Sequence, residues 1–162
     1  PPEPGIPPRG GTPSGGSERV KIQFDDEIRT GIEEVDAQHA VLIEIYNELD
    51  AAFQKGKANR QMSEILARLF QYTKEHFAAE ERLLVETGYP DLAQHQFEHE
   101  RLVEKLRGFV LRYRRGGQRI SAEVVEFVRN WVVSHIKGAD MAYVAHVKHH
   151  RGGALPTSVP ED

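Results

Sequence analysis

Apolar residues recur along this chain at alternating steps of three and four in four separate stretches. Steps of this size place side chains on one face of an α-helix, so each stretch predicts an amphipathic helix. The expected helices cover about residues 35–54, 61–86, 91–115 and 121–146. Glycines, or a glycine and a proline, follow the first three stretches, as is typical of helix ends. Helices of similar length joined by short loops predict an all-α fold, an antiparallel up-down-up-down four-helix bundle.

The ends of the chain differ in composition from this bundle. Residues 1–18 are mostly Pro and Gly with Ser and Thr, and cannot bury enough apolar surface to order themselves. They are expected to form a disordered tail or an interdomain linker. Residues 19–32 have no helical period and are expected to form an extended N-terminal arm. The predicted organisation is a bundle domain over 19–150, arm included, followed by a flexible tail over 151–162.

Composition excludes several classes of function. The chain has no cysteine, which excludes disulfides, thiolate zinc sites, iron–sulfur clusters and cysteine nucleophiles. A reducing compartment suits such a chain, so a cytoplasmic location is expected. No apolar run approaches the roughly 18 residues of a membrane span. Charges of both signs are mixed, with a net charge of −4, and the arginines at 112, 114, 115 and 119 are better explained by a solvated helix end. Neither a nucleic acid nor a membrane is therefore an expected partner.

Seven polar residues interrupt the apolar stripes at positions where an inward-facing residue is expected. They are His39 in the first helix, His76 and Glu80 in the second, His95 and His99 in the third, and His135 and Asp140 in the fourth. A spacing of four puts two side chains one turn apart on the same face of a helix. The spacing of five from His135 to Asp140 is less ideal, but a bridging carboxylate can lie off the axis of the histidine.

These seven residues form a candidate metal site. A single histidine on an apolar face is more often a hydrogen-bonded core residue, but burying five histidines and two carboxylates would be costly without partners. Metal coordination satisfies all seven, and imidazole with carboxylate suits iron, although spacing alone does not exclude manganese or a mixed-metal site. Oxygen-activating diiron carboxylate bundles use Glu-x-x-His pairs, whereas histidine outnumbers carboxylate here, which favours reversible O2 binding. His146, His149 and His150 are expected on a solvated helix end.

The order His, His-x-x-x-Glu, His-x-x-x-His, His-x-x-x-x-Asp resembles the hemerythrin family, in particular its bacterial hemerythrin-like domains. The segment over residues 31–39, Phe77 after His76, Glu81 after Glu80, and Trp131 four residues before His135 are also similar, and the resemblance covers about residues 22–146. It implies a non-haem diiron centre with two iron ions and an oxo or hydroxo bridge. One iron would be bound by His95, His99 and His135, the other by His39 and His76, and both by Glu80 and Asp140. Helix phase suggests an O2 pocket formed by Leu42, Ile43, Tyr72, Leu102 and Trp131.

The leading functional hypothesis is therefore reversible O2 binding for carriage, storage or delivery, without enzymatic turnover. The alternative is an O2 or redox sensor, with residues 1–18 linking the bundle to a signalling output domain. A diiron enzyme that reduces O2, peroxide or nitric oxide is less favoured, because no acid or base beyond the ligands is evident. A structural zinc bundle is the fourth hypothesis.

Overall fold

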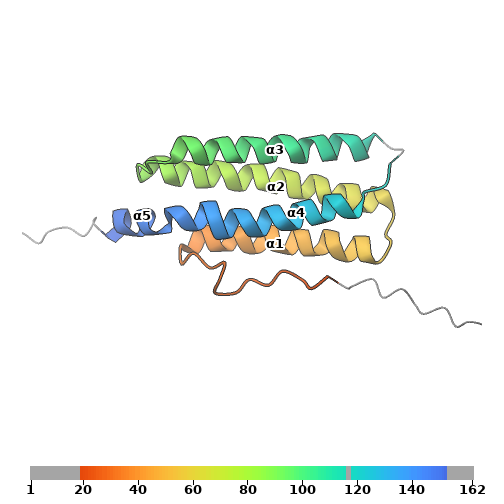
Figure 1. The fold of residues 1–162 in the computed structure, drawn as a ribbon, viewed down its shortest axis with the longest axis horizontal. Coiled ribbons are helices and arrows are strands. Elements are labelled where there is room, and N and C mark those ends of the chain that lie inside the picture. The colour runs from red at the N-terminus through yellow and green to blue at the C-terminus, as the bar shows by residue number, and fades with distance from the viewer. Residues whose placement is uncertain (1–18, 116–117, 153–162) are drawn as a thin grey trace, which may run out of the picture.

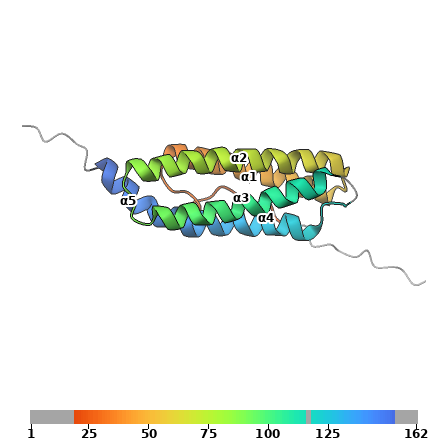
Figure 2. The same ribbon diagram turned by 90° about the horizontal axis from the view of Figure 1, so that it is seen from above.

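The computed structural model describes residues 19–115 and 118–152, and over these residues the chain is helical without any strand. The elements are α1 Glu33–Gln54, α2 Asn59–Glu86, α3 Leu92–Arg114, α4 Ala122–His135, the π-helical turn η1 Ile136–Asp140 and α5 Met141–Gly152. Figures 1 and 2 show α1 to α4 lying side by side, each running opposite to the preceding one. The predicted antiparallel four-helix bundle is confirmed.

The breaks between the helices fall where the sequence predicts them. Gly56 follows α1 and Gly88 follows α2, with φ angles of 63° and 64° in the left-handed region that favours glycine. The predicted tail at residues 1–18, the glycines at 116 and 117, and the last ten residues of the predicted C-terminal tail lie outside the described residues.

The last helix is longer than predicted. The expectation that it fades near His146 is wrong, because α5 continues to Gly152 and buries Tyr143 and Val147 against the other helices. His146 is half-buried and its Nε2 lies 2.6 Å from the Thr87 carbonyl oxygen, so it is not a solvated side chain. Its neighbours at 149 and 150 are exposed, as predicted.

The predicted N-terminal arm lies along α1 and α4. Ile22 and Ile28 of the arm are buried, and the Asn47 side chain makes two hydrogen bonds with the Ile22 backbone, at 3.0 and 2.8 Å. Arg129 of α4 donates a hydrogen bond of 2.7 Å to the carbonyl of Val20. The arm is thus fastened to both helices by backbone contacts, which is how a segment without a helical period can be ordered on the bundle.

The junction between the arm and α1 sets the position of the first candidate ligand. The Asp36 carboxylate accepts hydrogen bonds from the Thr30 N–H and hydroxyl and from the Gly31 N–H, at 2.7 to 3.0 Å. Gly31 has a φ of 78°, a conformation that suits glycine. These bonds fix where α1 begins, and hence the rotation of His39 one turn later.

The buried apolar side chains form two clusters. The larger runs through the bundle and includes Leu42, Phe77 and Ile136, whereas the smaller lies under α5 and includes Val35 and Tyr143. Along α1, along α2, and along the continuous helix formed by α4, η1 and α5, the candidate ligands lie between the residues of one cluster and those of the other. The seven polar residues therefore form a layer between the two apolar clusters.

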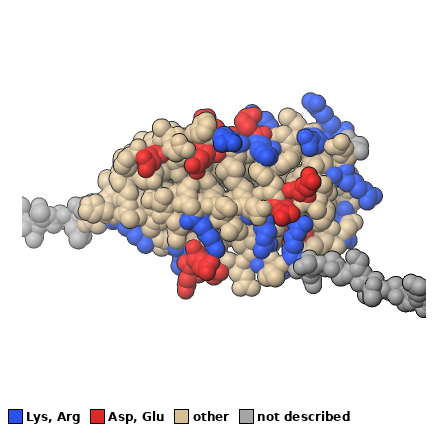
Figure 3. Space-filling model, in the orientation of Figure 1, with Lys and Arg blue, Asp and Glu red and all other residues tan. Residues whose placement is uncertain are grey.

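The surface is charged and mixed. Figure 3 shows acidic and basic side chains interspersed on one face of the bundle. Within the described ranges, no helix has the length and apolar character needed to cross a membrane.

Candidate metal centre

All seven candidate ligands meet in the polar layer, with side chains between 0 and 8% exposed. They form two overlapping groups whose donor atoms lie within 4.8 Å of one another. The first group contains His95, His99 and His135, the second contains His39 and His76, and both contain Glu80 and Asp140. Each group could hold a metal ion, and the two groups have both carboxylates in common.

The histidines approach the carboxylates through one kind of ring nitrogen. The short distances join His39 Nε2 to Asp140 Oδ2 (2.9 Å), His76 Nε2 to Glu80 Oε2 (3.0 Å), His95 Nε2 to Glu80 Oε1 (2.9 Å) and His135 Nε2 to Asp140 Oδ1 (3.1 Å). His99 Nε2 lies 3.1 Å from His135 Nε2. All five Nε2 atoms therefore face the interior of the cluster.

Two of the rings are oriented by acceptors on their outer side. His99 Nδ1 donates to Glu81 Oε1 at 2.8 Å, and His76 Nδ1 lies 2.6 Å from Gln38 Oε1. A carboxylate can only accept, so Glu81 fixes the proton of His99 on Nδ1 and leaves the Nε2 lone pair facing the centre. The sequence analysis did not identify these orienting contacts. Their signal in the sequence is weak, a polar residue directly beside a ligand in each case.

The protonation states of the histidines differ because their surroundings differ. Burial lowers the pKa of His99 to about 2, despite the opposing charge of Glu80, so this imidazole is neutral. Burial also acts to lower the pKa of His135, but the adjacent negative carboxylate of Asp140 outweighs it and raises that pKa. Burial opposes ionisation of Asp140, yet the His135 and His39 rings close to its oxygens hold its pKa well below the usual range. His99 is therefore a neutral imidazole, whereas Asp140 is an ionised carboxylate that favours the protonated form of His135.

This donor set fits metal ions. Within the described part of the chain, several inward atoms have no hydrogen-bond partner of acceptable geometry despite separations near 3 Å: His39 Nε2, His76 Nε2, Glu80 Oε2 and both Asp140 oxygens. Buried polar atoms are seldom left this way, and cations would satisfy all of them at once.

The π-helical turn brings Asp140 into the centre. In a straight α-helix, residues five apart point about 140° away from each other. The turn Ile136–Asp140 makes i to i+5 contacts instead, so His135 and Asp140 face the same point. The expectation of a carboxylate lying off the axis of a straight helix is therefore replaced by a local change of helix type.

A small apolar cavity adjoins the centre. It has a volume of about 10 Å³, which is on the scale of one water-sized molecule. Besides four of the candidate ligands, its walls are Leu42, Phe77, Trp131, Val132 and Ile136. The cavity contacts the group of His39 and His76, together with His135 and Asp140.

Only part of the suggested O2 pocket lines this cavity. Leu42 and Trp131 do, whereas Ile43, Tyr72 and Leu102 do not. Ile43 is rotated about 100° from Leu42 around α1 and lines a shallow groove beside Lys21. Leu102 lines a groove of about 380 Å³ that Trp131 and His135 also border. Phe77 was not in the suggested pocket, but it forms part of the wall of the small cavity. Its ring is stacked on that of His99, with centroids 3.6 Å apart.

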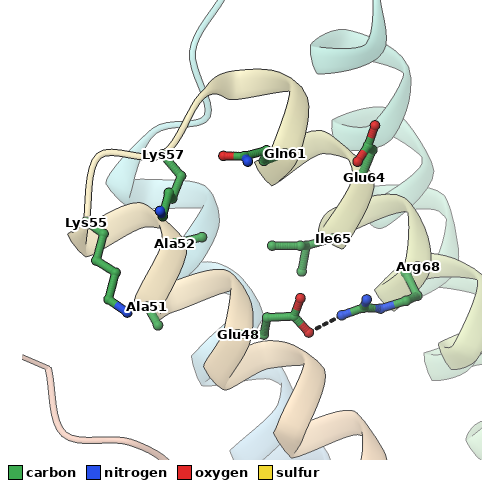
Figure 4. Close-up of a pocket in the computed structure, with 9 residues that line it drawn as sticks. All are labelled: Glu48, Ala51, Ala52, Lys55, Lys57, Gln61, Glu64, Ile65 and Arg68. Atoms are coloured by element: carbon green, nitrogen blue, oxygen red, sulfur yellow. Dashed lines mark hydrogen bonds and ion pairs between the residues drawn. The ribbon is translucent and has the colours of Figure 1, made fainter.

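A larger groove of about 570 Å³ lies at the end of the bundle where α1 and α2 are joined. Figure 4 shows side chains of both helices around it, with an ion pair between Glu48 and Arg68. None of the candidate ligands lines this groove. The candidate metal ligands are therefore in the polar layer, away from this larger groove.

Comparison with known proteins gives a consistent result. Residues 30–147 match a family model described as the hemerythrin HHE cation binding domain. A bacteriohemerythrin of Stenotrophomonas maltophilia is 35% identical over 129 residues, covering 80% of this chain and 83% of that protein. A bacteriohemerythrin of Pseudomonas aeruginosa is 32% identical over 128 residues, covering 79% and 82%. A crystal structure of wild-type hemerythrin superposes with a TM-score of 0.67 at 28% identity, covering 73% of this chain and 90% of that one.

Proposed function

The chain belongs to the hemerythrin family, a family of non-haem iron proteins that bind O2, and we propose that it binds O2 reversibly at a pair of iron ions for carriage, storage or delivery. The observation that carries the proposal is the pair of overlapping donor groups that share Glu80 and Asp140. When bound, an iron pair supplies the electrons and the open position that reversible O2 binding needs.

The ligand roles that we propose follow the two groups. His95, His99 and His135 would hold one iron, and His39 and His76 the other, with Glu80 and Asp140 shared. The second group has fewer histidines, and both of them line the small cavity, whereas His135 is the only histidine of the first group that does. We therefore place O2 in the cavity next to His39 and His76.

The other residues hold the ligands in place and exclude water. Glu81 and Gln38 fix two of the rings from outside, and Leu42, Phe77 and Trp131 present apolar surface to the cavity. Among the residues that line the cavity, only the candidate ligands are acids or bases. Enzymatic reduction of O2 needs a proton donor in addition to electrons, so this lining favours binding over turnover.

The test is iron content together with the visible spectrum of the anaerobically reduced protein, before and after O2 is added and removed. We expect two irons per chain, a colourless reduced form, and a charge-transfer band that appears with O2 and disappears on its removal. Protein loaded with Zn²⁺ is the control and should show no band. A single metal per chain, or iron that oxidises without a reversible band, would contradict the proposal.

A second candidate function, an O2 or redox sensor, is favoured by one contact. Lys137 of the π-helical turn lies 2.7 Å from Glu27 of the arm, so the element that carries Asp140 touches the segment leading towards the N-terminus. Both side chains are exposed, and an exposed ion pair contributes little by itself. Amide hydrogen exchange of the arm with and without O2 would test this function. A sensor requires a change in arm protection, whereas a carrier requires slow autoxidation and no such change.

A further inference from the structure

The Tyr143 hydroxyl is buried without a hydrogen-bond partner. Tyr143 lies on α5, three residues after Asp140, and its side chain is 0% exposed. Its hydroxyl has no partner of acceptable geometry within the described ranges. Burial of an unpaired hydroxyl opposes folding, so such a group in a well-packed interior requires an explanation.

The surroundings of Tyr143 connect it to the polar layer. Its ring packs edge-on against the ring of His95, with centroids 5.6 Å apart and an interplanar angle of 73°. His95 Nε2 in turn lies 2.9 Å from Glu80 Oε1 and 3.5 Å from Asp140 Oδ1, so the ring that Tyr143 packs against is closer to Glu80. Burial, followed by the negative charges of Glu80 and Asp140, raises the pKa of Tyr143. A tyrosine hydroxyl is protonated at neutral pH and an ionised carboxylate can only accept, so Tyr143 is the donor in any hydrogen bond between them.

We propose that the Tyr143 hydroxyl donates a hydrogen bond to the Glu80 carboxylate when metal ions occupy the centre, and so positions this shared ligand. The inference rests on the proposed function, because it needs ions in both donor groups. A carboxylate has about four lone-pair sites, and bridging two ions uses only two of them. One remaining site is then available to a donor, and a hydrogen bond there fixes the carboxylate orientation. Tyr143 is a positioning residue and not a ligand.

The bundle contains a matched control. Tyr46 of α1 is also 0% exposed, and its hydroxyl also lacks a partner within the described ranges. It lies two turns beyond His39, among the apolar side chains of the larger cluster. Tyr143→Phe and Tyr46→Phe therefore remove the same atom from equally buried positions. Position 143 lies beside the polar layer and position 46 lies away from it.

The experiment measures each variant with and without metal. Urea unfolding gives the stability of the metal-free proteins, and anaerobic competition titration gives their affinity for Fe²⁺ and Co²⁺, with the visible Co²⁺ spectrum as a probe of ligand geometry. We expect Tyr143→Phe to bind Fe²⁺ about 10- to 100-fold more weakly and to shift the Co²⁺ spectrum. Its metal-free form should be as stable as the wild type, or more so. Tyr46→Phe should match the wild type in affinity and spectrum.

Two outcomes would overturn the inference. Wild-type affinity and spectrum in Tyr143→Phe would show that the hydroxyl does not touch a ligand. A loss of metal-free stability in Tyr143→Phe without a change in the Co²⁺ spectrum would show a packing role only. Failure of the wild-type protein to bind two ions is a separate result, and it would overturn the proposed function as well.

Discussion

Replacing Glu81 with alanine tests how firmly the centre depends on the residues behind its ligands. Glu81 Oε1 accepts the hydrogen bond of His99 Nδ1 at 2.8 Å, and the side chains of His99 and Glu81 are 2% and 28% exposed. Removing the carboxylate leaves a buried N–H without its acceptor and frees the ring to rotate. Both the stability of the metal-free protein and its metal affinity should therefore fall.

The expected magnitudes follow from the burial of this pair. An unpaired buried donor costs about 1–3 kcal/mol, and water can reach the space left by the partly exposed Glu81, so we expect about 1–2 kcal/mol in the metal-free protein. Loss of a residue that orients a metal-bound histidine typically weakens binding about 10- to 100-fold, or about 1.4–2.7 kcal/mol. Glu81→Gln keeps an acceptor oxygen without its charge, and about half of each effect is expected, because charge-assisted bonds are roughly twice as strong as neutral ones.

Urea unfolding of the metal-free protein and anaerobic Fe²⁺ titration measure the two effects separately. Glu75→Ala is the control, because Glu75 is an exposed residue of the same helix whose carboxylate accepts a hydrogen bond from the nearby Gln71 side chain. It should leave Fe²⁺ affinity unchanged. If Glu81→Ala retains wild-type affinity and stability, the contact with His99 does not orient the ring and our account of the centre is incorrect.

Three further predictions concern the ligands, the helices and the arm. Asp140→Ala should bind fewer than two irons per chain, measured by metal analysis; two irons with a normal O2 spectrum would contradict the shared role of Asp140. Gly108→Ala, in an exposed helical position with open space around it, should raise the free energy of unfolding by about 0.5–1 kcal/mol, whereas Gly56→Ala, at a φ of 63°, should lower it by about 1 kcal/mol. Asn47→Ala should speed amide exchange in residues 20–24, because it removes both hydrogen bonds to Ile22; unchanged protection would mean that apolar burial alone holds the arm.

The apolar pattern was sufficient to predict the bundle, because it depends on local geometry. A stripe with helical period determines which face of each helix is buried, and His39, His76 and His99 occupy positions within such stripes. Their inward direction follows from phase alone. Once four inward faces meet, the polar residues in them must lie in the same interior, and the structure brings all seven together.

The orienting residues could not be predicted in this way, because their role depends on contacts between helices. Glu81 and Glu75 are both acidic residues of α2 outside its buried stripe, and nothing local distinguishes them. Glu81 differs only because α3 places His99 beside it. The O2 pocket suggestion met the same limit, since Leu42 lines the cavity and the adjacent Ile43 does not.

The π-helical turn was missed, although the sequence contains a signal for it. Continuing the α-helical phase from Trp131 and His135 would bury position 138 or 139, yet Gly138 is exposed and the buried position is Asp140. From Asp140 onwards the buried positions again follow steps of three and four, through Tyr143 and Val147. The two stripes are thus each regular but offset from each other by one residue, which a single wide turn absorbs without disturbing either. Here the offset of one residue falls between two candidate ligands, His135 and Asp140. Such an offset predicts a π-helical turn, because a straight helix would direct the carboxylate away from the histidine.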